Sequence, residues 1–168
     1  MKIFGLAGWS GSGKTTLIVR LLPELVRRGL SVSTMKHAHH EFDIDKPGKD
    51  SYEHRQAGAT EVMVSSARRY ALMHELRGAP EPTVEQLVAQ MAPVDLLLIE
   101  GFKQHGHDKL EVHRPSLGKA PLYAEDPRVV AVASDTPIEG LGRPRFDLDD
   151  VPAIASFIVA HCGLAKGR

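Results

Sequence analysis

Residues 5–29, "GLAGWSGSGKTTLIVRLLPELVRRG", join a glycine-rich segment to a run with helical periodicity. The segment Gly8–Thr15 matches the pattern G-x-x-x-x-G-K-[ST], in which glycines allow backbone N–H groups to wrap an anion. Apolar residues recur every three or four positions after it, which indicates a helix to Arg28 with Gly29 as its stop. Residues 2–7 are short and apolar, as in a buried strand. The stretch therefore predicts a strand, a phosphate-binding loop and a helix.

The positions within the loop have separate expected roles. Lys14 is expected to bring a positive charge to the β- and γ-phosphates of a nucleotide, and Thr15 to place its hydroxyl on Mg²⁺. The predicted nucleotide-binding residues of the loop are Gly11, Ser12, Gly13, Lys14, Thr15 and Thr16. A glycine-rich turn followed by an incidental Lys-Thr pair is the competing interpretation, and the strand–loop–helix context disfavours it.

The rest of the chain alternates between strand and helix patterns. Further strands are expected at residues 30–35, 61–65, 70–76, 94–99, 109–113 and 128–133, and further helices at 51–57 (capped by Ser51), 83–91 (Thr83 with Gln86 as a capping box) and 149–160. Pro23 removes a helical N–H, so we expect a kink or short break there. The alternation predicts a three-layer α/β fold of the P-loop NTPase type, with a mostly parallel sheet flanked by helices. We expect residues 136–144 to form a surface loop and residues 1–168 a single nucleotide-binding domain.

Composition narrows the class of protein. Lys plus Arg and Asp plus Glu both number 21, so the formal net charge is zero. The chain therefore lacks the overall positive charge that attracts nucleic acid. The one cysteine, Cys162, cannot form an internal disulfide, which favours a reducing compartment. No apolar run approaches the length of a membrane span. We therefore expect a cytoplasmic protein that binds neither nucleic acid nor membrane.

A magnesium site of this kind needs an acidic residue at the end of a buried strand. The segment "VDLLLIEGF" offers Asp95 and Glu100, which lie about 16 Å apart along a strand. Ligands bind beyond the carboxyl ends of parallel strands, and Glu100 is at that end. Glu100 is therefore the predicted metal ligand and a catalytic candidate beside Lys14, whereas Asp95 is expected to face solvent.

A second candidate region is the polar loop "KHAHHEFDIDKPGKD", residues 36–50, which follows the carboxyl end of the second strand. We expect Asp43 to contribute to the metal site, and the candidates for holding an anionic partner ligand are Lys36, His37, His39, Asp45 and Lys49, joined by Lys103 from a later loop. His37, His39 and His40 also suggest a transition-metal cluster, but no cysteine or obvious fourth ligand accompanies them. A solvated polar loop is the alternative for each residue.

Two later segments end in charged residues. The stretch "EGFKQHGHDKLEVHR" brings Lys109, His113 and Arg114 near strand ends, where cations suit a polyanionic ligand or are ordinary surface charges. The strand pattern "VVAVASD" ends in Asp135. A carboxylate accepts two hydrogen bonds from the N1 and N2 donors of guanine, so Asp135 is the candidate for base recognition. A helix cap or a turn is the alternative role.

Together these motifs resemble a known family. "GWSGSGKTTL", "KHAHHEFDIDKPGKDSYEHRQAGA", "LLLIEGFK" and "KLEVHR" resemble the molybdopterin-guanine dinucleotide biosynthesis adapter family, MobB, over about residues 2–135. The resemblance implies a homodimer that binds GTP with Mg²⁺ and hydrolyses it slowly at most. It also implies an accessory role with the guanylyltransferase MobA, which joins GMP to molybdopterin.

Two other functions compete with this reading. A small-molecule kinase or ATP-dependent synthetase should place arginines in a lid over the transferred phosphoryl group, and Arg68 and Arg69 are the only paired arginines outside the first helix. A nickel-type metallochaperone GTPase would instead use the histidines of the loop that begins at Lys36.

Overall fold

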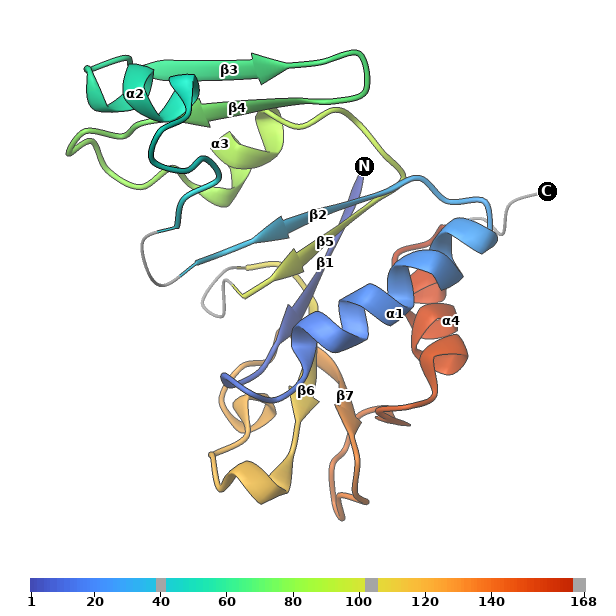
Figure 1. Ribbon diagram of the computed structural model, residues 1–168. Coiled ribbons are helices and arrows are strands. Elements are labelled where there is room, and N and C mark those ends of the chain that lie inside the picture. The colour runs from blue at the N-terminus through green and yellow to red at the C-terminus, as the bar shows by residue number, and fades with distance from the viewer. Residues whose placement is uncertain (39–41, 102–105, 165–168) are drawn as a thin grey trace. The chain divides into compact units, whose positions relative to one another are not determined.

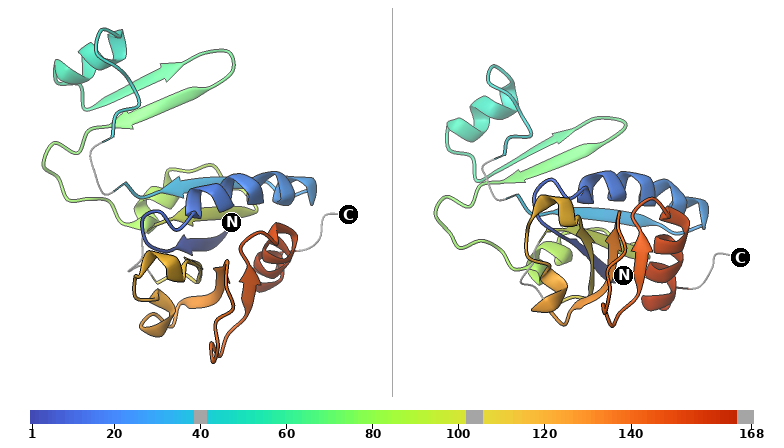
Figure 2. Two further views of the ribbon diagram at one scale, coloured as in Figure 1. Left: turned by 60° about the horizontal axis from the view of Figure 1, so that its bottom comes forward. Right: turned by 90° about the horizontal axis from the view of Figure 1, so that it is seen from below.

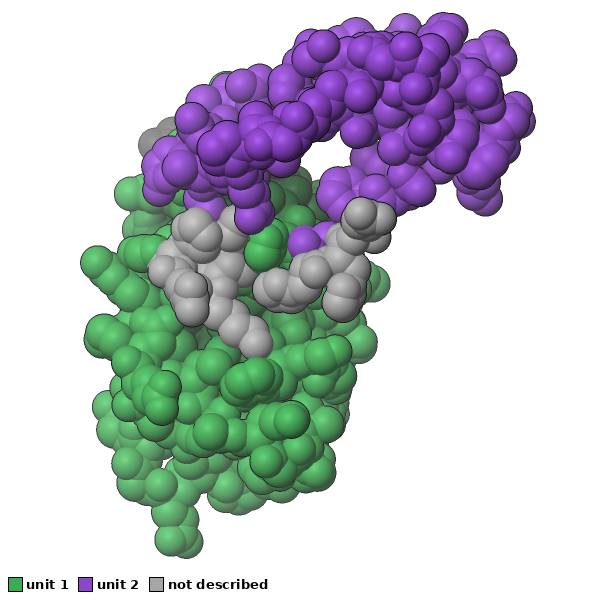
Figure 3. All heavy atoms as spheres, turned by 90° about the vertical axis from the view of Figure 1, so that its left-hand side faces the viewer, with its two compact units in different colours: residues 1–37, 92–168 green, residues 38–91 purple. Residues whose placement is uncertain are grey.

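A computed structural model describes residues 1–38, 42–101 and 106–164. The chain divides into two compact units, coloured separately in Figure 3. The first unit comprises Met1–His37 and Ala92–Arg168, and the second unit comprises Ala38–Met91.

The first unit is built on a six-stranded sheet (Figure 1). In spatial order its strands are β2 (Val32–Lys36), β5 (Leu96–Glu100), β1 (Lys2–Ala7), β6 (Lys109–His113), β7 (Val129–Ser134) and β8 (Arg145–Asp147). Every neighbouring pair in this sheet is parallel. All five residues of β5 are buried, as expected of a strand covered on both faces. The predicted α/β class with a mostly parallel sheet is confirmed.

Two helices cover one face of this sheet, α1 (Lys14–Arg27) and α4 (Val151–His161) (Figures 1 and 2). Helix α1 buries Leu17, Ile18, Leu21 and Leu25, which lie on one side at helical spacing. Helix α4 is capped by Asp150, whose carboxylate accepts a hydrogen bond from Ala153 N at 3.0 Å. Both helices share one apolar core with alternate residues of the strands, including Phe4, Leu6, Leu96, Leu98, Leu110 and Val112. This packing holds the start of α1 against the carboxyl edge of the sheet.

The opposite face of β6 carries charged side chains that are almost completely buried. Glu111 is fully buried and accepts hydrogen bonds from Leu122 N at 2.9 Å and Tyr123 N at 2.8 Å. These two donors begin a 3₁₀ turn, η2 (Leu122–Ala124). Lys109, the first residue of β6, is 1% exposed and pairs with Asp126 at 2.9 Å. Lys109 therefore fits neither role considered from the sequence, a cation for a polyanionic ligand or an ordinary surface charge, because it lies buried at the amino end of its strand and pairs with Asp126.

Helix α1 runs without interruption through Pro23, so the short break considered from the sequence is wrong. The carbonyl oxygen that loses its helical donor to proline belongs to Val19, four residues earlier. Val19 is 63% exposed, so that carbonyl lies on the solvent side of the helix. Gly29 has a φ of 83° and donates to Val26 O, which ends the helix as expected.

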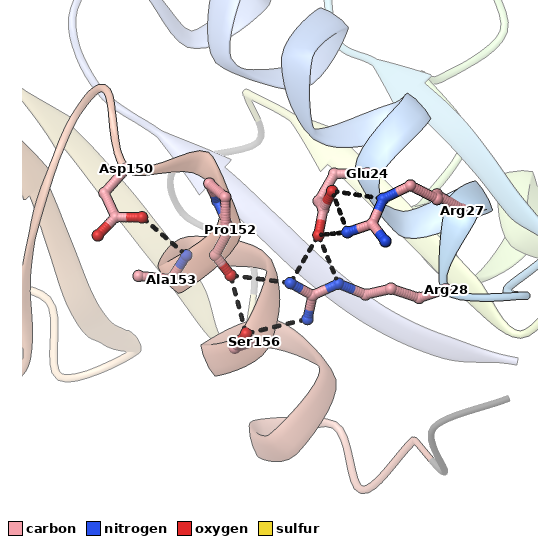
Figure 4. Close-up of polar contacts among 7 residues, drawn as sticks. All are labelled: Glu24, Arg27, Arg28, Asp150, Pro152, Ala153 and Ser156. Carbon is pink, nitrogen blue, oxygen red and sulfur yellow. Dashed lines mark hydrogen bonds and ion pairs between the residues drawn. The ribbon is translucent and has the colours of Figure 1, made fainter.

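The C-terminal turn of α1 is fastened to α4 by a charged cluster (Figure 4). Glu24 accepts hydrogen bonds from Arg27 and from Arg28, the latter from Nε at 2.8 Å. Arg28 also donates to Pro152 O and to Ser156 Oγ, both at 3.0 Å, and so joins the two helices. Hydrogen bonds from Arg27 and then Arg28 hold the pKa of Glu24 below its ordinary value.

Replacing Glu24 by glutamine is expected to lower the stability of the fold at neutral pH, and to lower it less in acid. A carboxyl whose folded pKa is depressed stabilises the fold above its unfolded pKa, ~4.3, and that contribution disappears as the pH falls through the folded pKa. Thermal unfolding at pH 7 and at steps down to pH 3 measures the difference between wild type and Glu24→Gln. Glu139→Gln, at an exposed loop position, is the control. A difference that does not depend on pH would contradict this assignment.

The second unit contains α2 (Asp50–Gln56), the strands β3 (Glu61–Ser65) and β4 (Tyr70–His74), and α3 (Val84–Ala89). Both strands were predicted, and the structure pairs them as an antiparallel hairpin. Thr83 caps α3 with the predicted capping box to Gln86. The cap predicted for α2 is wrong, because the helix begins at Asp50 with Lys49 as its N-cap and Ser51 lies inside it.

The short edge strand β8 had no counterpart among the predicted elements. It follows the predicted surface loop 136–144 and extends the sheet beside β7. Within the described residues, no helix has the length and apolar character needed to cross a membrane. The assignment of residues 1–168 to a single nucleotide-binding domain stays a prediction.

Candidate functional site

The glycine-rich loop lies between β1 and α1, at the carboxyl edge of the sheet (Figure 1). Strand β1 sits between β5 and β6, so the ends of both neighbours flank the loop. Strands β2 and β5 lie on one side of β1 and β6 lies on the other, so the strand order reverses at β1, and ligands bind at such switch points. The topology therefore places the loop where a nucleotide is expected.

Backbone conformation shapes the loop itself. Gly8, Gly11 and Gly13 have φ values of 142°, 79° and 101°, which side chains of L-residues rarely allow. Gly13 is the N-cap of α1, so the N–H groups of the first helical turn, which lie outside the i→i−4 hydrogen bonds of the helix, begin directly after it. These are the groups of Lys14, Thr15 and Thr16. The helix N-terminus is thus presented to an anion at the loop.

Lys14 folds its side chain back over the loop. Its Nζ donates to Gly8 O at 3.0 Å and to Trp9 O at 2.9 Å. Two backbone carbonyls therefore hold the ammonium group beside the helix N-terminus. In this position the positive charge adds to that of the helix dipole and favours binding of a phosphate.

Thr15 and Glu100 meet across the loop. Thr15 Oγ1 donates to Glu100 Oε1 at 2.7 Å, and Glu100 is the last residue of β5 and only 9% exposed. Two neighbouring ligands of an octahedral Mg²⁺ ion, each ~2.05 Å from the metal, are about 2.9 Å apart. Both oxygens are of the hard type that Mg²⁺ prefers, so the pair fits this ion. Asp95 is at the other end of the strand, exposed and bound to Ser31, as expected.

Lys36 and His37 lie beside Glu100 at the same edge. Lys36 ends β2, and its Nζ is 3.9 Å from Glu100 Oε1. The backbone N–H of His37 donates to Glu100 O at 3.0 Å, and a side chain added at Gly101 would stand 3.3 Å from His37 Cβ. The structure therefore brings two of the predicted partner-ligand residues next to the predicted metal ligand.

The segment after β6 packs against the opposite side of the loop. Trp9, in the loop, donates from Nε1 to Ala120 O at 2.7 Å. Leu117 lies in a 3₁₀ turn, η1 (Pro115–Leu117), and would be 4.0 Å from a Cβ at Gly11. Arg114 donates from Nε to Ser12 O at 3.0 Å and from Nη1 to Asp135 Oδ2 at 2.6 Å. Arg114 had been noted in the sequence only as a cation near a strand end, and its contact with the loop was not predicted.

Asp135 follows the last residue of β7 and is a third exposed. Its carboxylate is engaged by Arg114, and thereby linked to the phosphate-binding loop. Its role in recognising a base stays a prediction. His113, at the end of β6, is buried and packs edge-on against the ring of Tyr123. It therefore belongs to the interior beneath the loop rather than to a surface for an anion.

In the second unit the predicted acidic residues surround one arginine. Arg55, from α2, pairs with Asp43 Oδ1 and Asp45 Oδ1, both at 2.8 Å, and lies 3.6 Å from Glu75 Oε1. The hydrogen bond from Arg55 to Asp45 is the main cause that raises the pKa of this guanidinium above its ordinary value. Asp43 and Asp45 thus hold the loop to α2 and the hairpin. A metal role for Asp43 and a partner-ligand role for Asp45 and Lys49 stay predictions.

The other predicted site residues lie outside the described part of the chain or away from the loop. His39 and Lys103 lie outside the described residues, as does His40 of the suggested histidine cluster. Within residues 1–38, 42–101 and 106–164, no three His, Cys, Asp or Glu side chains gather in a way that could hold a metal ion. Arg68 and Arg69, considered for a kinase lid, lie in the turn of the β3–β4 hairpin. Cys162 is buried, and burial raises the pKa of its thiol, in keeping with a passive residue.

Comparison with known proteins gives a consistent result. Residues 3–135 match the family model described as "Molybdopterin guanine dinucleotide synthesis protein B", MobB. Two proteins named molybdopterin-guanine dinucleotide biosynthesis adapter protein are similar to the chain. The Escherichia coli K12 protein is 42% identical over 94% of this chain and 91% of its own length, and the Haemophilus influenzae protein is 42% identical over 93% and 86%. The crystal structure of Bacillus subtilis MobB is similar with a TM-score of 0.77, 27% identity, and coverage of 96% of this chain and 98% of that one.

Proposed function

The chain belongs to the MobB family of molybdopterin guanine dinucleotide synthesis proteins, and from this membership we propose that it is a GTP-binding adapter in the conversion of molybdopterin to its guanine dinucleotide. The observation that carries the nucleotide part of this proposal is the hydrogen bond from Thr15 Oγ1 to Glu100 Oε1 at 2.7 Å. Lys14 directly precedes Thr15 in the loop. These three side chains provide two hard oxygen ligands and one fixed cation at a helix N-terminus. That combination suits a nucleoside triphosphate with Mg²⁺.

In this proposal the backbone N–H groups of Gly11 to Thr16 hold the phosphates, and Lys14 exchanges its two carbonyl partners for phosphate oxygens. Thr15 and Glu100 would hold Mg²⁺, which would neutralise part of the negative charge of the phosphates. Asp135 would accept the N1 and N2 hydrogens of guanine. We expect hydrolysis to be slow at most, because an adapter has to hold the nucleotide rather than consume it.

The partner-ligand part of the proposal concerns molybdopterin and the guanylyltransferase MobA. Molybdopterin carries a phosphate, and the cationic side chain of Lys36 beside the nucleotide site suits such a group. Candidates that would join it are His37, His39, Asp45, Lys49 and Lys103. Guanylylation by MobA would then use GTP and pterin in the presence of this surface, in the cytoplasm, where we place the protein by its relation to biosynthetic adapters.

We also propose a homodimer in solution. Residues Met63, Tyr70 and Leu72 lie on one face of the β3–β4 hairpin and are 61%, 72% and 45% exposed. An exposed apolar face on a two-stranded sheet favours pairing with another copy, and β4 is the strand at which we expect the interface. A mass in solution equal to that of one chain would contradict this part of the proposal.

Removal of the acidic metal ligand tests the nucleotide site. Mg²⁺ is expected to tighten GTP binding to the wild type, and Glu100→Gln to abolish most of that gain, about tenfold or ~1.4 kcal/mol, because a neutral amide replaces the charged ligand. Trp9 is the only tryptophan and lies in the loop, so its fluorescence reports binding in titrations with GTP or ATP, with Mg²⁺ or with a chelator.

The control for this experiment is Glu53→Gln, an exposed carboxylate of α2 in the second unit. It should leave the magnesium dependence unchanged. If Glu100→Gln kept the full magnesium effect, Glu100 would not be the ligand. If ATP bound as tightly as GTP to the wild type, the guanine part of the proposal would fail.

A further inference from the structure

Arg114 joins two parts of the site that are far apart in sequence. Its Nε donates to Ser12 O at 3.0 Å, and its Nη1 donates to Asp135 Oδ2 at 2.6 Å. Ser12 belongs to the phosphate-binding loop, and Asp135 follows β7. The guanidinium of Arg114 thus connects the phosphate-binding loop to Asp135, the residue expected to recognise the guanine base.

The guanidinium also lies directly against the loop backbone. A Cβ at Gly13 would be 3.7 Å from Arg114 Nη2 and 3.8 Å from Nε. The planar group therefore packs over Gly13, the residue before Lys14. Two hydrogen bonds fix its position, one to the carbonyl of Ser12 and one to the carboxylate of Asp135. The bond to the carboxylate is the stronger, because both of its partners are charged.

The chain that carries Arg114 is itself held at several points. Glu111, three residues earlier, is buried and binds the N–H groups of Leu122 and Tyr123. The segment between them is tied to the loop by the hydrogen bond from Trp9 to Ala120 O. Arg114 consequently starts from a backbone anchored on both sides, which favours one orientation of its side chain.

The pairing leaves Asp135 able to accept further hydrogen bonds. A carboxylate offers about four acceptor positions on its two oxygens, and Arg114 is bound to one oxygen, Oδ2. The hydrogen bond from Arg114 favours one orientation of the carboxylate. The donor pair N1–H and N2–H of guanine can then meet an already oriented acceptor, whereas adenine presents no such pair.

We propose that Arg114 is a specificity-determining residue, which positions the carboxylate of Asp135 for guanine and couples base recognition to the phosphate-binding loop. The inference rests on the proposed function, since it takes a guanine nucleotide as the ligand. Arg114 acts through Asp135 and is a positioning residue. If Arg114 only stabilised the phosphate-binding loop, its removal would weaken the binding of all nucleotides equally. A selective loss of GTP affinity therefore distinguishes the positioning role from a structural one.

The test compares dissociation constants for GTP, ATP and xanthosine triphosphate in the presence of Mg²⁺, read from Trp9 fluorescence. Arg114→Met, which keeps an unbranched apolar side chain and removes the charged guanidinium, is expected to weaken GTP binding about tenfold and ATP binding much less, so that the GTP preference falls. Arg114→Lys should give an intermediate value, because one ammonium cannot bind Ser12 O and Asp135 with the fork of a guanidinium.

Asp135→Asn tests the same geometry from the other side. An asparagine donates its N–H to the O2 of xanthine and accepts N1–H with its oxygen, so this variant should favour xanthosine triphosphate over GTP. The matched control is Arg128→Met, which breaks a comparable arginine–aspartate pair, Arg128 with Asp108 at 3.2 Å, next to the amino end of β7. It should leave all three constants unchanged.

Equal losses for GTP and ATP in Arg114→Met would overturn the proposal in favour of a brace on the phosphates, and no loss would reduce the contact to a surface ion pair. A variant that fails to fold is recognised by its circular dichroism, and Asp135→Asn then decides: retained GTP preference would overturn the inference. Failure of the proposed function is distinct, because it appears in the wild type as an absence of GTP binding.

Discussion

Replacing Lys14 by alanine is expected to weaken GTP binding by about 100-fold, or ~2.7 kcal/mol. The ammonium group is held by Gly8 O and Trp9 O next to the first turn of α1, so it is in place before the nucleotide arrives. A hydrogen bond to a charged group contributes roughly 1.5–3 kcal/mol, and in the proposed complex Lys14 would donate to oxygens of the β- and γ-phosphates. Isothermal titration or Trp9 fluorescence measures the loss.

The control for Lys14→Ala is Lys2→Ala, at the first residue of the same strand that leads into the loop. Lys2 lies at the amino end of β1, so its removal should leave GTP affinity unchanged. The stability of the fold should change little in Lys14→Ala. The variant loses the hydrogen bonds to Gly8 O and Trp9 O, but it also removes a positive charge that is unfavourable at a helix N-terminus without an anion. GTP affinity within a factor of two of the wild type would contradict the assignment of the site.

Replacing Gly8 by alanine is expected to destabilise the fold by about 3 kcal/mol and to abolish nucleotide binding. The new Cβ would stand 2.5 Å from Val112 O and 2.7 Å from Ser12 Oγ, and the backbone φ of 142° also disfavours a side chain. Val112 belongs to the central strand β6, so its carbonyl cannot move without disturbing the sheet. Thermal unfolding should show a melting temperature lower by roughly 6–12 °C.

Gly58→Ala separates the two causes of this effect. Gly58 also has a positive φ, 112°, but a Cβ there would meet no described atom within 4 Å. Its loss of stability should therefore reflect backbone strain alone, about 1 kcal/mol, which is less than the loss expected for Gly8→Ala. If Gly8→Ala were no less stable than Gly58→Ala, close packing under the loop would not be the reason for glycine at position 8.

The local parts of the site were predictable from the sequence. The loop from Gly8 to Thr15 is one continuous segment whose chemistry follows from residue type and spacing. The position of Glu100 at the carboxyl end of β5 followed from a topological argument, that parallel strands present their carboxyl ends at one edge, and its role as a metal ligand stays a prediction. The structure brings it to Thr15 at 2.7 Å. The capping box at Thr83 and the stop at Gly29 are likewise local, because each depends on residues within one turn.

The parts that were wrong or missed depend on tertiary structure. Strand β8 has three residues, Arg145–Asp147, too few for a periodic pattern, and it exists because β7 offers an edge. Helix α1 continues through Pro23 because Leu21 and Leu25 are buried in the core on either side of it. Lys109 looked like a ligand for an anion and is instead buried with Asp126, a pairing between residues 17 apart.

Arg114 and Arg55 show the same difficulty within the site itself. Arg114 contacts Ser12, 102 residues away, and Asp135, 21 residues away, and neither contact has a sequence signature. Arg55 pairs with Asp43, predicted as a metal ligand, and with Asp45, predicted to hold a partner ligand, and the sequence did not predict either ion pair. Cations that neutralise such carboxylates are recognised only when the side chains are placed in space.

The most direct test of the adapter role measures formation of molybdopterin guanine dinucleotide from molybdopterin and GTP by the guanylyltransferase, with this chain added at increasing concentration. We predict that the wild type raises the rate or yield of the product, that Lys14→Ala does not, and that Lys2→Ala acts as the wild type does. Equal stimulation by wild type and Lys14→Ala, or none by the wild type, would contradict the account.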